Sequence, residues 1–288
     1  MLTESRYRLH TVRHVLEYYM ENHGFGTESW ADLANMTNVF IQVMGKKNLK
    51  DLQPEHFNAY ISGRKRGAFG KRPAKSSGTL RRELSHLQTA IHFCVKAKLV
   101  NPEHAPFIPL PDKPPPRDRW LDKREIQMLK DAAVPESRAD IFIRIVLATG
   151  ARKNVVETLE WNQVNFSTNM IVFEKVGARR TNKKKPTVPM HGELRLFLER
   201  MHAKRTNNYV LGCATKINDA LDAVAHRAGL VGVTPHVLRH TWASHASMNG
   251  VSLGEIARVL GDSIVTVEKV YAKFQPGYLK NAVEQAAL

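Results

Sequence analysis

Residues 234–274 read TPHVLRHTWASHASMNGVSLGEIARVLGDSIVTVEKVYAKF, and the rest of the chain is best understood from them outward. The first part places His236, Arg239 and His240 on one turn of an expected helix. The segment then breaks at a glycine, continues through a short helix to a second glycine, and ends in a helix that carries Tyr271. A cationic cluster followed by a tyrosine is chemically suited to hold a phosphodiester and to attack it.

The composition indicates a polyanionic partner. The 288 residues carry 43 Lys+Arg against 27 Asp+Glu, a net charge of +16, which favours nucleic acid. An anionic membrane surface is less favoured, because no apolar run approaches the roughly 20 residues of a membrane span and the N-terminus lacks a signal-peptide core. A merely solvated basic surface is the remaining alternative. We expect a cytoplasmic, nucleoid-associated protein.

The cysteines and histidines give no sign of a metal or cofactor. Cys94 and Cys213 lie far apart without CxxC spacing and are expected to stay reduced. The 13 histidines include no HExxH pattern, and His236 and His240 flank an arginine that would repel a cation. We therefore predict neither a metal site nor a cofactor.

The first 105 residues are expected to form a helical bundle. Apolar residues recur at helical spacing, most clearly where Leu80, Leu84, Leu87 and Ile91 mark one face. The expected helices are Tyr7–Asn22, Ser29–Gly45, Pro54–Gly63 and Thr79–Leu99.

A basic segment follows the third expected helix. It contains no acidic residue between positions 64 and 82, and its glycines loosen the backbone. Such a segment can follow a phosphate backbone and displace condensed counterions, although a basic loop that binds nothing is the alternative. The predicted DNA contacts are Arg64, Lys65, Arg66, Lys71, Arg72, Lys75, Arg81 and Arg82.

A proline-rich segment separates the two halves of the chain. Residues 106–116 read PFIPLPDKPPP and hold six of the 14 prolines, which excludes a helix. We predict a semi-rigid linker at residues 106–118 between a domain of residues 1–105 and a second domain of residues 119–288. A strap between two basic domains suits a clamp around duplex DNA.

The second half begins with helices and then a hairpin. Residues 138–149 are expected to form a buried helix that Gly150 ends in a left-handed cap, so that Arg152 follows on a fixed turn. Pairing of Arg152 with Glu157 or Glu160 is the structural alternative. Residues 170–174 and 186–190 are expected to form a β-hairpin whose tip carries Lys175, Arg179, Arg180, Lys183, Lys184 and Lys185.

Together these motifs resemble the tyrosine recombinases, the phage-integrase family. The resemblance rests on TGAR at residues 149–152, the basic hairpin, HVLRHTWAS at 236–244, LGDS at 260–263 and VYAKF at 270–274. The helical first half is similar to that family's core-binding domain by length, charge and position. The implied fold is mainly α with a small antiparallel β-sheet, a two-domain DNA clamp with a helical core-binding domain and an α+β catalytic domain.

The resemblance also implies roles for individual residues. Tyr271 would be the nucleophile, Arg152 and Arg239 would hold the scissile phosphate, and His236 would assist proton transfer. A hairpin lysine would be the general acid, for which Lys183 is preferred and Lys175 and Lys184 remain alternatives. The implied activity is metal- and ATP-independent strand cleavage and rejoining through a 3′-phosphotyrosine, for integration or excision of a phage or mobile element.

Asp262 departs from the family pattern. The family most often has histidine, sometimes tryptophan, after the Leu-Gly pair, and both donate a hydrogen bond that an ionised aspartate cannot donate. Asp262 could cap the next helix beside Ser263, could be held protonated, or could make the enzyme slower. Helix capping is the preferred explanation, because aspartate and serine are favoured at that position.

The expected partners follow from the resemblance as well. They are double-stranded DNA, a homotetramer on synapsed sites, and accessory DNA-bending proteins. The tail at residues 276–288 carries a weak apolar stripe that is either core or a contact between protomers. Two other functions stay open: a helix-turn-helix regulator built on residues 251–271, and a type IB topoisomerase that relaxes DNA.

Overall fold

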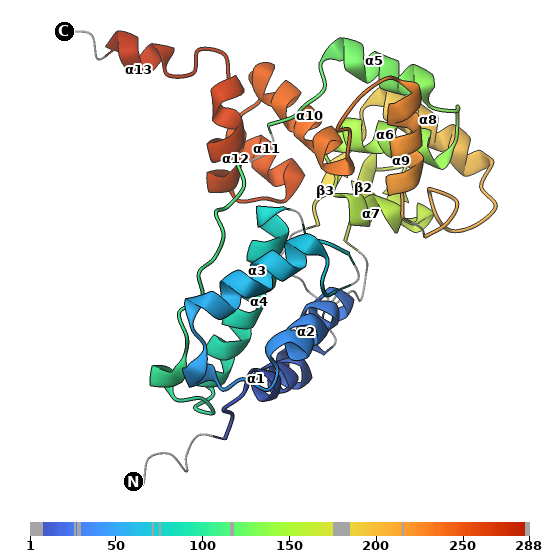
Figure 1. Cartoon of the computed structure of the whole chain (residues 1–288). Helices are drawn as coiled ribbons and strands as arrows, with labels where there is room; N and C mark the ends of the chain where they lie inside the picture. Colours follow the sequence, from blue (N-terminus) through green and yellow to red (C-terminus); the bar gives the residue numbers. More distant parts are fainter. Residues whose placement is uncertain are drawn as a thin grey trace. The chain divides into compact units, whose positions relative to one another are not determined.

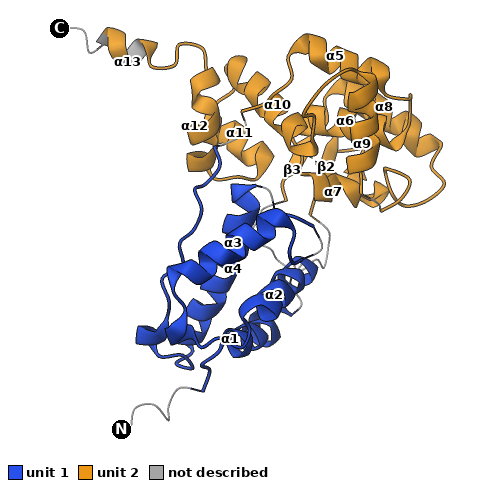
Figure 2. Ribbon diagram, viewed as in Figure 1, with its two compact units in different colours: residues 1–116 blue, residues 117–288 orange. Residues whose placement is uncertain are grey.

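The computed structural model describes residues 8–25, 27, 30–70, 72–74, 76–115, 118–174, 185–214 and 216–285. The chain divides into two compact units, residues 1–116 and 117–288, which Figure 2 colours separately. The division falls within the proline-rich stretch of residues 106–118. Each unit contains its own cluster of buried apolar side chains.

The first unit is a bundle of helices, as the apolar spacing predicted (Figure 1). Its α-helices are α1 (Val12–Tyr19), α2 (Trp30–Met44), α3 (Pro54–Arg66) and α4 (Ser77–Lys96). A π-helical turn, Met20–Gly24, continues α1, and short 3-10 turns occupy Leu49–Asp51 and Pro102–His104.

Helix α4 supplies much of the core of this unit. Leu84, Leu87 and Ile91 are almost completely buried, as their spacing on one helical face requires. Cys94 continues the same face, and its Sγ lies 3.7 Å from the carbonyl oxygen of Val15 in α1. The face predicted from the sequence is therefore the one that packs against the bundle.

The second unit combines helices with a small sheet. Its helices are α5 (Lys123–Ala132), α6 (Arg138–Thr149), α7 (Lys153–Glu157), α8 (Gly192–Ala203), α9 (Asn218–Arg227), α10 (Pro235–Met248), α11 (Leu253–Leu260), α12 (Ile264–Tyr271) and α13 (Lys280–Gln285). Helix α6 is central, because Phe142, Ile143, Ile145 and Val146 are all fully buried and α10 packs against it.

The sheet has three short antiparallel strands in the order β1-β2-β3. Strands β2 (Met170–Val172) and β3 (Thr187–Pro189) form the predicted hairpin, with Ile171 paired to Val188. Strand β1 (Val164–Asn165) pairs with β2 and was not predicted. Two residues are too few to produce a periodic signal.

Helices α10, α11 and α12 share a separate small core. Ile256, Ala257 and Leu260 of α11 and Val267 and Tyr271 of α12 are buried in it together with Ala243 of α10. Ser252 caps α11 in a capping box with Glu255, and a glycine with φ of 64° ends the helix. Caps at both ends of α11 fix the direction of the α12 helix that follows it. They thereby fix the position of Tyr271.

Within the described ranges, every helix is too short or too polar to cross a membrane.

Candidate active site

Two arginines from distant segments meet at the end of α6. Gly150 ends that helix with φ of 63°, as predicted, and Arg152 lies immediately before α7, at its N-cap position. Arg239 comes from α10 and is buried, with Nη1 donating to the carbonyl oxygen of Gly150 at 2.8 Å and Nη2 to that of Leu260 at 3.0 Å. The turn after α6 and the end of α11 therefore hold the Arg239 guanidinium in place.

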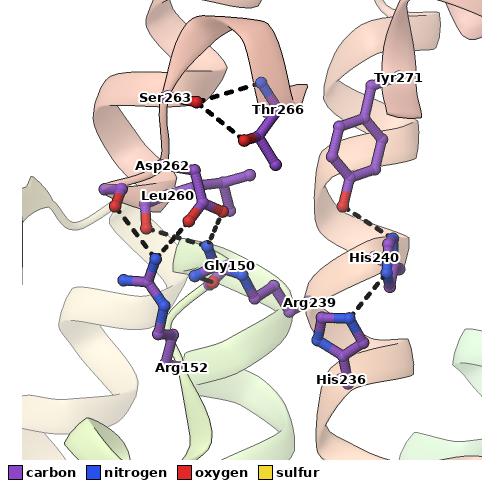
Figure 3. A network of polar contacts seen from close by, with 11 residues as sticks. Gly150, Arg152, His236, Arg239, His240, Leu260, Asp262, Ser263, Thr266 and Tyr271 are labelled. Atoms are coloured by element: carbon purple, nitrogen blue, oxygen red, sulfur yellow. Dashed lines mark hydrogen bonds and ion pairs between the residues drawn. The ribbon is translucent and has the colours of Figure 1, made fainter. Parts of the chain in front are cut away.

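Asp262 joins the two guanidinium groups. Its Oδ2 accepts from Nη2 of Arg239 at 2.5 Å, and its Oδ1 accepts from Nη2 of Arg152, which also donates to the carbonyl oxygen of Gly261 at 3.1 Å. Figure 3 shows the carboxylate between the two arginines. This arrangement can hold an anion with several oxygen acceptors.

The predicted capping role of Asp262 is wrong. Ser263 caps α12 instead, with its hydroxyl accepting from the backbone N–H of Thr266 at 3.2 Å. Asp262 can reach the arginines because it precedes the cap, in the turn that follows Gly261. The arginines offer a stronger, charge-assisted set of donors than the helix end does.

Tyr271 lies at the end of a chain of two histidines. Its hydroxyl is 2.8 Å from Nδ1 of His240, and Nε2 of His240 is 2.9 Å from Nε2 of His236. The backbone carbonyl of Tyr271 accepts from the hydroxyl of Ser247 at 2.8 Å, which ties α12 to α10. The tyrosine itself is 5% exposed.

Burial sets the protonation of this chain. It raises the pKa of Tyr271 to about 12, with Arg239 acting in the opposite direction. Burial, helped by His236 and Arg239, lowers the pKa of His240 to about 4, and it lowers the pKa of His236 as well. Near neutral pH both imidazoles are uncharged and can accept protons.

The site therefore contains five of the six predicted catalytic residues. Arg152, His236, Arg239, Asp262 and Tyr271 come from the turn after α6 and from α10, the α11–α12 turn and α12. The sixth, Lys183, and its alternatives Lys175 and Lys184 lie outside the described residues.

His240 is the residue whose role the sequence did not reveal. It was recognised only as part of a cationic turn, yet it is the group in contact with the hydroxyl of Tyr271. The available signal was its spacing of four from His236, which puts both rings on one helical face. The contact with Tyr271 depends on how α12 packs, and local spacing does not show that.

The predicted DNA contact through Arg64 is wrong. Arg64 is buried, and its guanidinium donates to both oxygens of Glu83 at 2.6 and 3.0 Å and to the carbonyl oxygens of Phe69 and Arg72 at 2.9 and 2.8 Å. Tyr60 donates to the same carboxylate at 2.8 Å. Arg64 thus pins the loop after α3 to α4, with four of its five N–H donors already used within the protein.

The other basic residues of that segment have mixed environments. Arg81 donates to the carbonyl oxygen of Pro111 at 2.6 Å, and Arg82 pairs with Asp32 at 3.0 Å while remaining exposed. Lys65, Arg66 and Arg72 are exposed, and Lys71 and Lys75 lie outside the described residues. DNA contacts by these residues stay a prediction.

Comparison with known proteins identifies the family. The profile described as the phage integrase family matches residues 119–276. The integrase of Escherichia phage 186 is 25% identical over 287 residues, covering 95% of this chain and 80% of that protein. The tyrosine recombinase XerA of Thermococcus onnurineus is 26% identical over 197 residues, covering 65% of this chain and 69% of that protein.

Solved structures give the same fold. The Tn1549 transposon integrase in complex with circular intermediate DNA superposes with a TM-score of 0.75 at 14% identity, covering 97% of this chain and 100% of that one. The chain belongs to the phage integrase family and is a site-specific DNA recombinase of the tyrosine type.

Proposed function

We propose that Tyr271 is the nucleophile of this recombinase and that Arg152 and Arg239 bind the scissile phosphate. The observation that carries the proposal is the convergence of two distant guanidinium groups on one carboxylate, that of Asp262. A carboxylate and a phosphate both present acceptor oxygens that suit arginine donors. Asp262 thus marks the position that the phosphate would take, next to the helix that carries His236 and His240.

The proposed reaction needs neither metal nor ATP. The Tyr271 oxygen bonds to phosphorus while the bond to the 5′ oxygen breaks, which leaves a 3′-phosphotyrosine and a free 5′ hydroxyl. Positive charge from the arginines stabilises the oxygens of the transition state. The phosphotyrosine conserves the bond energy, so the 5′ hydroxyl of another strand can reverse the step and join to it.

A lysine of the segment between β2 and β3 is proposed to protonate the leaving 5′ oxygen. Lys183 is the preferred candidate, and Lys175 and Lys184 are the alternatives. General acid catalysis of such a step is worth about 10²- to 10⁴-fold in rate.

The proposed biological role is integration or excision of a phage or mobile element. Support comes from the relative in phage 186, which is named an integrase. We further propose that a homotetramer assembles on two synapsed DNA sites in the nucleoid, with tail contacts between protomers and accessory DNA-bending proteins. A DNA-relaxing enzyme would act without synapsis, so relaxation of supercoiled plasmid without recombinant products would favour that alternative.

Covalent capture tests the proposed chemistry. The full chain is mixed with a library of nicked duplexes of randomised sequence, because a nick lets the cleaved fragment diffuse away and traps the adduct. We expect denaturation-resistant protein–DNA complexes from the wild type, whose sequencing gives the recognised site, and none from Tyr271→Phe. Tyr278→Phe, in the exposed segment after α12, is the matched control and should react normally. Equal capture by wild type and Tyr271→Phe would refute the proposal.

A further inference from the structure

We propose that His240 is the catalytic group that takes the hydroxyl proton of Tyr271 and that it passes its own Nε2 proton to His236. The proposal deepens the proposed function and rests on it, because it requires Tyr271 to be the nucleophile. The resemblance to the family assigned proton transfer to His236 alone, whereas this proposal assigns it to His240 and His236 together.

The three side chains form a continuous row. Both links lie in the range of ordinary hydrogen bonds: 2.8 Å from the Tyr271 hydroxyl to Nδ1 of His240, and 2.9 Å between the two Nε2 atoms of His240 and His236. The two imidazole rings stand one helical turn apart, with centroids at 4.3 Å and planes at 80°. Figure 3 shows His240 between the tyrosine and His236, so His236 reaches the phenol only through His240.

One assignment of protons satisfies every contact in the row. If the phenol donates, Nδ1 of His240 accepts, and the neutral ring then carries its proton on Nε2. That N–H donates to Nε2 of His236, whose own proton is on Nδ1. The opposite direction would leave the phenolic proton without an acceptor among the described residues, although Tyr271 is buried.

The environment sets the protonation state of the row before reaction. Burial lowers the pKa of both histidines, so both are neutral near pH 7 and the first can accept a proton. Burial raises the pKa of Tyr271 to about 12, so the phenol keeps its proton until a base removes it. Because the pKa of Tyr271 lies far above that of His240, the proton does not transfer before the reaction. It must move while the bond to phosphorus forms, which is general base catalysis.

The step is balanced without a further reactant. The Tyr271 oxygen gains a bond to phosphorus and loses its proton to Nδ1 of His240, while the Nε2 proton of His240 moves to His236. The positive charge ends on His236, whose pKa is lowered by burial and by Arg239 and raised in part by the carboxylate of Asp262. The 5′ oxygen leaves with a proton from the separate acid, and ligation runs each transfer in reverse.

Single-turnover cleavage of a nicked duplex, with the sequence that covalent capture recovers, tests this role. His240→Asn places an amide near the position of Nδ1, which can accept from the phenol but cannot take its proton, and His240→Phe removes the acceptor. We expect both variants to cleave about 10²-fold more slowly or worse, given the usual size of general base catalysis. Ligation should slow by the same factor. His226→Asn, at an exposed position of α9, is the matched control and should cleave at the wild-type rate.

One modified substrate and one modified enzyme separate this role from a structural one. A sulfur in place of the bridging 5′ oxygen leaves without needing a proton, so it should rescue a variant of the hairpin acid and leave the His240→Asn defect intact. A fluorinated tyrosine at position 271 is more acidic and should restore much of the His240→Asn rate. Circular dichroism and DNA binding at the wild-type level establish that the variant is folded.

The possible failures are distinguishable. Cleavage by His240→Asn at the wild-type rate, or its rescue by the sulfur substrate, would overturn the relay while leaving Tyr271 as nucleophile. A folded wild type that forms no covalent adduct would overturn the proposed function, and the relay with it.

Discussion

Asp262 sets the charge of the site. Its carboxylate accepts from Arg152 and Arg239, the two groups assigned to the phosphate. Its side chain is 29% exposed, so solvent weakens the contact and a DNA phosphate can compete for the same donors. If the two arginines bind the scissile phosphate as proposed, the phosphate must first displace the carboxylate of Asp262 from them.

Neutralising Asp262 should speed cleavage. We expect Asp262→Asn and Asp262→His to raise the single-turnover rate roughly fivefold, because a partly exposed ion pair contributes about 1 kcal/mol. Histidine should exceed asparagine, since it can also carry a positive charge toward the phosphate. Asp131→Asn, which makes the same charge change on the exposed surface of α5, should leave the rate unchanged. A slower Asp262→Asn would instead show that the carboxylate is needed to orient the arginines.

At the scale of residues, sequence reasoning succeeded where partners are local. The spacing of His236 and Arg239 placed both on one turn of α10, where the structure has them. The predictions for Arg64 and Asp262 failed, because their partners Glu83 and Arg152 lie outside the local sequence, 19 and 110 residues away. Charge patterning cannot tell a buried ion pair from a free cation, because burial is decided by packing between elements.

The turn after α6 connects fold and site. Gly150 adopts a left-handed conformation, and its carbonyl oxygen accepts from Arg239. A Cβ at this position would lie 2.7 Å from Cε3 of Trp242 and 2.8 Å from Cδ2 of Leu260. The backbone of α6 and the α10–α11 pair therefore approach as closely as only glycine permits.

Replacing Gly150 should harm both stability and activity. We expect Gly150→Ala to lower the free energy of unfolding by about 2–4 kcal/mol, from left-handed strain plus overpacking. Gly250→Ala is the matched control. Gly250 is also left-handed, with φ of 80°, but a Cβ added there would meet no atom within 4 Å beyond its chain neighbours, so only the strain of about 1–2 kcal/mol remains. Urea denaturation measures both variants, and equal losses would refute the close approach.

Elements were predictable where periodicity and caps are strong. The buried face of α4, the glycine end of α6 and the β2–β3 hairpin all follow from local patterns. The expected basic loop was too long, because Gly67 rather than Gly63 ends α3. The basic residues at 64–66 belong to the helix, in whose last turn cations are favoured.

The whole molecule shows how little sequence identity this fold needs. The chain superposes on the Tn1549 integrase with a TM-score of 0.75 at only 14% identity. Cores tolerate extensive substitution when volume and apolar patterning are kept, so one fold can be specified by very different residues. The boundary between the two compact units, at residues 116 and 117, falls within the proline-rich stretch, where the local composition changes. The candidate site is assembled from side chains of four segments, and local composition does not predict how those segments pack.

The most direct test of the proposed chemistry is to identify the residue that becomes linked to DNA. Trypsin digestion of the captured complex, followed by mass spectrometry, separates VYAK (residues 270–273) from FQPGYLK (residues 274–280), so Tyr271 and Tyr278 fall in different peptides. We predict that VYAK carries a nucleotide linked to Tyr271 through its 3′ phosphate. An adduct on any other tyrosine, or one linked through a 5′ phosphate, would contradict the mechanism.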